Sequence, residues 1–194
     1  MKKIAISTLA VLLACPAFAG NPNQGSSWTM WGLDPYIGLR GGMGYTNLNY
    51  RFDNDKESMT DFVFHGRAAM GLEICDTVRS EVEWSLYGKS KDSANGVETS
   101  TKLQTLLLNA YMEFGDYQII RPFLGVGGGI GFVKVDANNN APTYDKTSFS
   151  AMGTLGVSFD MEMFAVDVAA RYNYVDVASG LHNFGGDIGI RFMF

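Results

Sequence analysis

The chain has 194 residues, the size of one domain, and its composition is unusual mainly in its 23 glycines and its 13% aromatic share. Its formal net charge is −5, and removal of a leader that carries Lys2 and Lys3 makes it about −7. This acidic balance excludes nucleic acid as a partner class, and two cysteines, Cys15 and Cys75, are too few for a disulfide framework.

The first predicted element is a leader. Lys2 and Lys3 precede an apolar run from Ile4 to Ala14, and a small-residue site, Ala17-Phe18-Ala19, follows. This order is typical of a secretory signal peptide, so residues 1–19 are expected to be removed near Ala19. A competing interpretation is a lipoprotein box that acylates Cys15, but the leucine before the small residue of that box is a poor match.

A short segment separates the leader from the rest of the chain. Residues 20–33 are expected to lie in the periplasm, where Trp28 and Trp31 could anchor at a membrane interface or pack under the mouth of the following domain. Beyond the leader no stretch supplies the roughly 20 consecutive apolar residues that a membrane-spanning helix needs.

Residues 34–194 are predicted to be all β. Segments of about ten residues alternate between apolar and polar positions and are separated by polar turns, and we count eight of them. In chain order their apolar positions run Ile37–Tyr45, Phe62–Ile74, Val78–Leu86, Leu106–Phe114, Leu124–Phe132, Phe149–Phe159, Val166–Tyr174 and Phe184–Phe194.

The formal charges of these segments all fall on the opposite parity. They are Arg40, Arg67, Glu73, Arg79, Glu81, Glu83, Glu113, Asp167, Arg171, Asp187 and Arg191. Two architectures explain this alternation: a soluble barrel or sandwich with an apolar core, or a membrane barrel with an apolar outer wall and a polar lumen.

Three observations favour the membrane barrel. Phe and Tyr gather near the segment ends of the apolar face, as in the aromatic girdles of membrane barrels. The charges are nearly balanced, which suits the narrow interior of an eight-stranded barrel, and an Arg facing lipid would cost about 2–4 kcal/mol. Finally, the chain closes on "GIRFMF", with Phe192 and Phe194 on the apolar parity.

The leader, the strand "PYIGLRGGMGY", the segment "LNAYMEF" and Phe194 resemble the small eight-stranded outer-membrane barrels of the opacity-protein and OmpA/OmpX-like group. The resemblance implies an antiparallel up-and-down transmembrane barrel over residues 34–194, in the outer membrane of a Gram-negative bacterium. It implies outer-membrane lipid and lipopolysaccharide as surroundings, and periplasmic chaperones and the barrel-assembly machinery as biogenesis partners. Gly189, Phe192 and Phe194 match the signal that this machinery reads in the group.

The connections predict which ends face which side. Short links at residues 75–77, 115–118 and 160–163 are expected to be periplasmic turns. Longer polar links at residues 46–61, 88–100, 134–147 and 175–182 are then expected to face the outside, either as a binding surface for a host or cell-surface ligand or simply as solvated loops.

Catalytic chemistry is not expected. The two histidines, His65 and His182, lack a suitably spaced serine, so His65 is predicted to be a structural lumen residue and His182 a loop residue. Asp53, Asp55 and Glu57 alternate without the glycine and distal glutamate of a calcium loop. No cofactor or metal is predicted.

The phrase "PYIGLRGGMGY" returns as "PFLGVGGGIGF" 87 residues later. The second copy opens no helix and precedes no Lys-Ser/Thr, so it is not a phosphate loop. In an eight-stranded ring the two copies would lie opposite each other, through duplication or through convergence. Their inward glycines are expected to make room for bulky lumen groups such as Arg79, Glu81 and Tyr87.

The sequence therefore predicts a surface-exposed interaction or structural protein with a largely plugged lumen. A narrow pore for small solutes is the alternative, because the glycines remove bulk from two strands. A lipid A-modifying enzyme is a distant third.

Overall fold

The computed structural model describes residues 33–52, 55–75, 77–88, 90–94, 97–115, 119–137, 144–161, 163–177 and 180–194. The predicted signal peptide, Cys15 and the segment with Trp28 and Trp31 lie outside these residues. The described strands are β1 (Asp34–Phe52), β2 (Asp55–Cys75), β3 (Val78–Tyr87), β4 (Ser90–Ala94), β5 (Val97–Glu113), β6 (Ile120–Ala137), β7 (Tyr144–Met161), β8 (Phe164–Val175) and β9 (Leu181–Met193). Within the described residues, no helix is long and apolar enough to cross a membrane.

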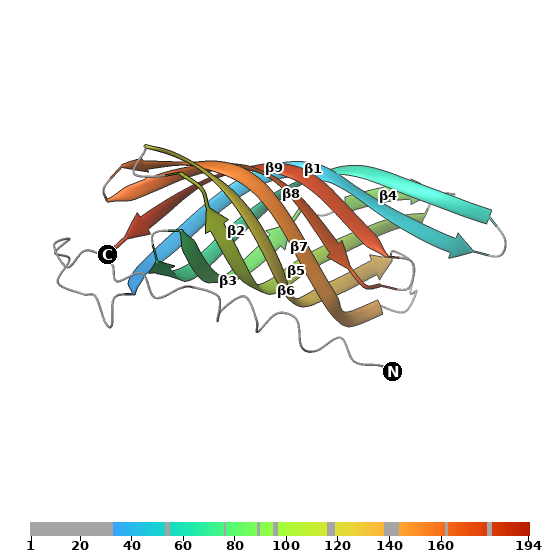
Figure 1. Ribbon diagram of the computed structural model, residues 1–194. Helices are drawn as coiled ribbons and strands as arrows, with labels where there is room; N and C mark the ends of the chain where they lie inside the picture. Colours follow the sequence, from blue (N-terminus) through green and yellow to red (C-terminus); the bar gives the residue numbers. More distant parts are fainter. Residues whose placement is uncertain are drawn as a thin grey trace, which may run out of the picture.

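The strands form one closed antiparallel barrel (Figure 1). Each strand except β3 pairs with the next along the chain, β1 pairs with β9, and a pairing between β3 and β5 completes the ring. Because β3 and β4 both pair with β5, they are the lower and upper parts of one strand position in the barrel wall, which we call a stave. The nine described strands therefore make eight staves. The prediction of an eight-stranded up-and-down barrel is confirmed.

The outer wall of the barrel is apolar and its interior is polar. Successive side chains of a strand point to opposite faces, so one parity faces outward throughout. Outward residues such as Leu39, Met70 and Ile188 are 57%, 70% and 63% exposed, whereas Glu83 and Arg191 are fully buried inside. This arrangement reverses that of a soluble barrel and matches a lipid-facing wall around a polar lumen. It decides between the two architectures that the alternation left open.

The predicted periplasmic turns are short connections in the structure. β2 ends at Cys75 and β3 begins at Val78, and the next two lower connections join Glu113 to Ile120 and Met161 to Phe164. These short connections hold consecutive strands in antiparallel register.

The prediction of long outer loops is wrong, because most residues of the predicted loops belong to strands. Pairing of β1 with β2 continues from Thr46 opposite Asp61 to Phe52 opposite Asp55. The β4–β5, β5–β6 and β6–β7 pairings also extend through the regions predicted as loops. Above the membrane both faces of a hairpin meet water, so backbone pairing persists without apolar alternation. Of the four predicted loops, only the connection after Val175 has about its predicted length.

An apolar cluster closes the outer end of the interior. It contains Val63, Tyr87, Leu103, Val133, Val175 and Leu181. Tyr87 and Val175 are the last residues of β3 and β8, and Leu181 is the first of β9, so these side chains meet at the outer mouth. We call this group the outer cap. A second cluster of Leu107, Tyr111, Phe123 and Met152 packs deeper inside.

Candidate functional site

The interior of the barrel brings the predicted charges together. The eleven residues come from β1, β2, β3, β5, β8 and β9; nine are buried, and the Arg40 side chain is only 7% exposed. Period-two alternation is the local cause, since each charge has the inward parity of its strand. Glu73, at the lower end of β2, is the most open, with a side chain 21% exposed.

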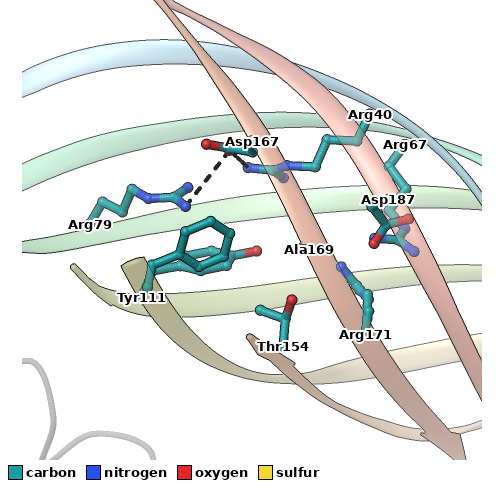
Figure 2. Close-up of a pocket in the computed structure, with 10 residues that line it drawn as sticks. Arg40, Arg67, Arg79, Tyr111, Thr154, Asp167, Ala169, Arg171 and Asp187 are labelled. Carbon is teal, nitrogen blue, oxygen red and sulfur yellow. Dashed lines mark hydrogen bonds and ion pairs between the residues drawn. The ribbon is translucent and has the colours of Figure 1, made fainter. Parts of the chain in front are cut away.

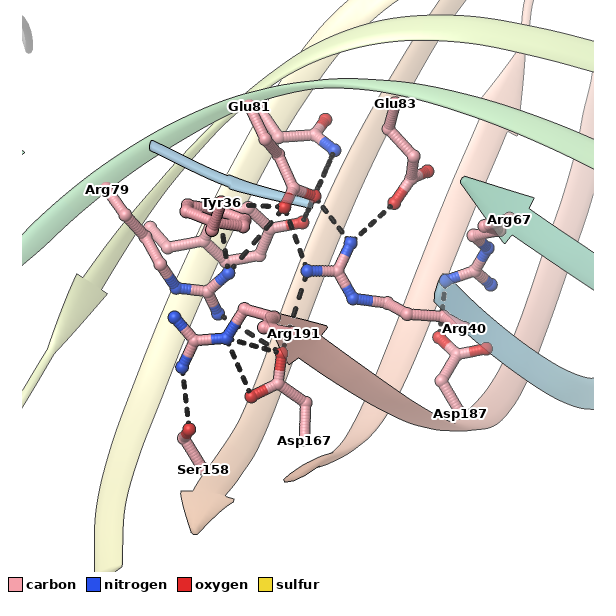
Figure 3. A network of polar contacts seen from close by, with 12 residues as sticks. Tyr36, Arg40, Arg67, Arg79, Glu81, Glu83, Ser158, Asp167, Asp187 and Arg191 are labelled. Carbon is pink, nitrogen blue, oxygen red and sulfur yellow. Dashed lines mark hydrogen bonds and ion pairs between the residues drawn. The ribbon is translucent and has the colours of Figure 1, made fainter. Parts of the chain in front are cut away.

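Glu81 is at the centre of this network (Figure 3). Arg40 donates two hydrogen bonds to its carboxylate, at 2.7 and 2.8 Å, in a bidentate pair. The hydroxyls of Tyr36 and Tyr111 donate to the same carboxylate at 2.9 and 2.6 Å. Donors from β1 and β5, on either side of β3, therefore compensate one fully buried negative charge.

Glu83 forms the second centre. Arg171, on the far wall, donates to both of its carboxylate oxygens at 2.6 and 2.8 Å, and Ser85 donates at 2.8 Å. Arg40 lies 3.4 Å away and links this pair to Glu81. The Glu83–Arg171 pair spans the lumen from β3 to β8.

The lower end of the lumen is crossed by Arg191. Its guanidinium lies 3.1 Å from Asp167, 2.9 Å from Glu73 and 3.2 Å from Glu113. Arg79 donates to Glu113 from the other side at 2.8 Å and stacks on the Tyr111 ring at 4.0 Å. The five groups make a continuous layer of alternating charge across the barrel.

Two members of this lower layer were not predicted. Arg121 forms ion pairs with Asp160 and with Glu113, and Asp160 also lies 3.6 Å from Arg191. Asp160 was assigned to a turn, and Arg121 precedes the proline where the repeated phrase begins. Their inward parity on β6 and β7 could have identified both.

A third group lies beneath the outer cap. The His65 ring nitrogen Nε2 is 2.5 Å from Asp187, and Arg67 donates to the other Asp187 oxygen at 2.5 Å. His65 thus has the polar partners expected of a structural lumen residue. Its Nδ1 atom is buried and has no hydrogen-bond partner among the described residues.

The other candidate sites hold no catalytic or metal-binding arrangement among the described residues. The prediction that His182 is a loop residue is wrong, because it belongs to β9 and lies opposite Tyr174 of β8. Its ring contacts the Tyr172 hydroxyl at 2.6 Å, and Ser179 lies outside the described residues. Within the described part of the chain no three His, Cys, Asp or Glu side chains are grouped as metal ligands. Asp53 and the side chains of Asp55 and Glu57 lie outside that part.

A small cavity lies among the charged residues of the lumen. A cavity of about 10 Å³ lies between Arg40, Arg67, Arg171 and Asp167, with Tyr111 and Thr154 on its opposite wall (Figure 2). This volume is about that of one water molecule. Charged and aromatic side chains of the described residues line the section between the outer cap and the lower layer.

The inward glycines of the repeated phrases sit against different neighbours from those expected. A Cβ on Gly42 would overlap Asp187, His65 and the Gly186 carbonyl, and one on Gly125 would overlap the Tyr111 ring. Of Arg79, Glu81 and Tyr87, none is among these contacts, because the register brings other side chains to β1 and β6. These strands lie four staves apart in both directions, which confirms that the two copies are opposite.

The residues of the predicted assembly signal lie at the lower end of β9. Phe192 and Phe194 face outward and are 47% and 54% exposed, while Gly189 packs inward against the Arg40 side chain. Their recognition by the assembly machinery stays a prediction.

Comparison with known proteins identifies the fold. A family model for the outer membrane protein beta-barrel domain matches residues 5–192. A protein of Rickettsia conorii named "Putative adhesin RC1281" is 28% identical over 134 residues, which are 58% of this chain and 54% of that protein. The chain thus spans about half the length of this curated relative.

Solved structures of low sequence identity share the fold. Neisserial surface protein A matches with a TM-score of 0.65 at 20% identity, over 82% of this chain and 97% of its own. Ail, the attachment invasion locus protein of Yersinia pestis, in complex with the heparin analogue sucrose octasulfate, matches at 0.51, with 13% identity over 83% and 99%. The outer membrane enzyme PagL matches at 0.50, with 12% identity over 78% and 97%.

Proposed function

The chain belongs to the outer membrane protein beta-barrel domain family, and on that premise we propose that it acts at the cell surface through its outer hairpins, with a plugged and non-catalytic barrel as their support. Its place is the outer membrane of a Gram-negative bacterium. The surrounding lipid and lipopolysaccharide, and the assembly machinery that reads Gly189, Phe192 and Phe194, are its proposed partners in the cell envelope.

The layers of apolar and charged side chains across the lumen are the observation that carries this proposal. A solute would have to pass the outer cap, the Arg40–Glu81–Glu83 centre and the lower layer around Arg191, and the cavity between them is about 10 Å³. Opening this path means separating buried ion pairs, and removing a buried charge from its partner costs about 3–5 kcal/mol. The structure therefore favours a support over the alternative of a narrow pore.

The hairpins supply the surface. The β1–β2 hairpin continues for seven paired positions beyond the girdle residues Tyr45 and Phe62, and it projects from the barrel in Figure 1. Extended hairpins present backbone and side chains to a partner at low conformational cost. The names of RC1281 and Ail, an adhesin and an attachment protein, support the same role.

Two measurements test the proposal. The purified barrel is expected to show no steady conductance in planar bilayers, and steady single-channel currents would establish the pore instead. Cells that display the full chain should adhere to host cells, and exchange of residues 46–61 for a two-residue turn between Tyr45 and Phe62 should abolish adhesion. Unchanged adhesion, with the exchanged barrel still shifted by heating on a gel, would contradict a role for this hairpin.

A further inference from the structure

A group of aromatic and polar side chains lies at the outer ends of β8 and β9, away from the lumen network. It consists of Tyr172 and Tyr174 of β8, Asp176 directly after β8, and His182 of β9, and we call it the rim cluster. The ring centroids of Tyr172 and Tyr174 lie 6.0 and 5.3 Å from that of His182. The Tyr172 hydroxyl is 2.6 Å from His182 Nδ1, and the Tyr174 hydroxyl donates to Asp176 at 3.3 Å.

The rim cluster is continuous with the lipid-facing surface of the barrel. Tyr45, Phe184 and Tyr172 face one another across β1, β9 and β8 in the register, and all three are exposed on the outer wall. Tyr174 and His182 form the next pair of the same parity, two residues farther toward the outer mouth on each strand. Exposed aromatic side chains mark the membrane interface, so the rim cluster lies where the outer-leaflet headgroups begin.

The neighbours of the two tyrosines on β7 are small. In the register Tyr174 lies opposite Ala151 and Tyr172 lies opposite Gly153. A Cβ built on Gly153 has no heavy atom within 4 Å, and Tyr172 is 44% exposed. A molecule of the outer leaflet can therefore reach the aromatic rings from the side of β7.

The rim cluster combines aromatic faces with hydrogen-bonding groups. The negative face of an aromatic ring attracts C–H groups. When the Tyr172 hydroxyl donates to Nδ1 of His182, the neutral imidazole carries its proton on Nε2 and can donate a hydrogen bond there, while the Asp176 carboxylate accepts. A pyranose ring offers the complementary groups, a face of C–H bonds surrounded by hydroxyls. A phosphate fits less well, because the Asp176 carboxylate repels it.

We propose that the rim cluster binds the sugar headgroup of an outer-leaflet glycolipid. A pyranose ring lies on the faces of Tyr172 and Tyr174, its hydroxyls bond to His182 and Asp176, and the acyl chains lie on the outer wall beside Phe184. A glycolipid fits better than a soluble sugar because the cluster is continuous with surface that lies in the bilayer. The inference rests on the membrane placement of the barrel and not on adhesion.

The test titrates the full mature chain in detergent with lipid A stripped of its phosphates, which keeps the sugar rings and the acyl chains, and follows binding by native mass spectrometry. Tyr174→Leu removes a ring face and His182→Leu removes a donor, so each should bind about fivefold more weakly. Tyr174→Phe keeps the ring and should retain most of the binding. Phe132→Leu is the matched control, because Phe132 is an exposed aromatic of the outer wall on β6, and it should bind as the original chain does. Phosphatidylglycerol, which has no sugar ring, should bind the original chain and all variants equally.

Several outcomes would overturn the site. Unchanged binding in Tyr174→Leu and His182→Leu would remove it, and an equal loss in Phe132→Leu would reduce the effect to the aromatic girdle as a whole. An equal loss for phosphatidylglycerol would mean that the sugar is not recognised. Binding of free glucosamine as tightly as the lipid would replace the glycolipid with a soluble sugar. Heat modifiability on a gel verifies that each variant is folded. Because these variants leave residues 46–61 intact, the result stands apart from the adhesion test.

Discussion

At the scale of single residues, the barrel interior depends on charges that are each held by several partners. Glu83 is fully buried and accepts hydrogen bonds from Arg171 and Ser85. Glu83 stabilises the fold less through its attraction to Arg171 than by preventing a buried arginine from being left without a partner. Removing both charges of such a pair is therefore less harmful than removing one.

A double-mutant cycle measures this difference. Glu83→Leu should lower the free energy of unfolding by about 3–5 kcal/mol, because the Arg171 charge is then left in the lumen, whereas Glu83→Leu combined with Arg171→Leu should lose much less. Urea unfolding in lipid vesicles, followed by tryptophan fluorescence, gives the values. If the double variant loses the sum of the two single losses, the pair is not coupled as the structure indicates.

At the scale of elements, adjacent glycines of β1 lie on opposite faces of the strand and therefore differ in how closely they are packed. Gly42 faces the lumen, where His65, Asp187 and the Gly186 carbonyl leave no room for a Cβ. Gly41 faces outward and has no heavy atom within 4 Å of a built Cβ. The repeated phrase thus contains glycines that the packing requires beside glycines that it does not.

The two positions form a matched pair of variants. Gly42→Ala should lower the free energy of unfolding by about 1–3 kcal/mol, because the added methyl group meets a backbone carbonyl that cannot move without the sheet. Gly41→Ala should have little effect. The same unfolding measurement in vesicles compares them, and equal losses would show that the close approach at Gly42 is relieved without cost.

At the scale of the whole molecule, the apolar outer wall and polar lumen are stable only with lipid around the barrel. Ile188, in the middle of β9, is 63% exposed on this wall, and Thr147 is an outward polar residue near its upper edge. Lipid is therefore part of the folded state, and the cost of a charge on the wall depends on its depth.

Arginine substitutions at two depths test this dependence. Ile188→Arg should destabilise the barrel by about 2–4 kcal/mol, and Thr147→Arg by about 1 kcal/mol or less, since only the second side chain reaches the headgroups. Unfolding in vesicles measures the difference, with the unboiled gel shift as a check on folding. Similar losses at both positions would mean that Ile188 does not face the membrane interior.

Much of this molecule could be predicted from the sequence because a membrane barrel imposes period two on every strand. Eight staves, their outward faces, the lumen position of Arg40, Glu81 and Arg191, and the opposition of the two repeated phrases all follow from that alternation. Each of these predictions depends only on the alternation of residues within a strand. None needs the register between paired strands. The family and the outer-membrane location were implied by the resemblance of the predicted leader, the first strand and the last residues to small outer-membrane barrels.

The tertiary structure alone decided what depends on the stagger between strands. The pairing of Arg171 with Glu83 joins β8 to β3, and the neighbours of Gly42 come from both β2 and β9, so each contact joins strands far apart in the chain. The outer hairpins were missed for the complementary reason. Outside the membrane both faces of a strand meet water, so continued backbone pairing leaves no alternation in the sequence, and only the registered backbone reveals it.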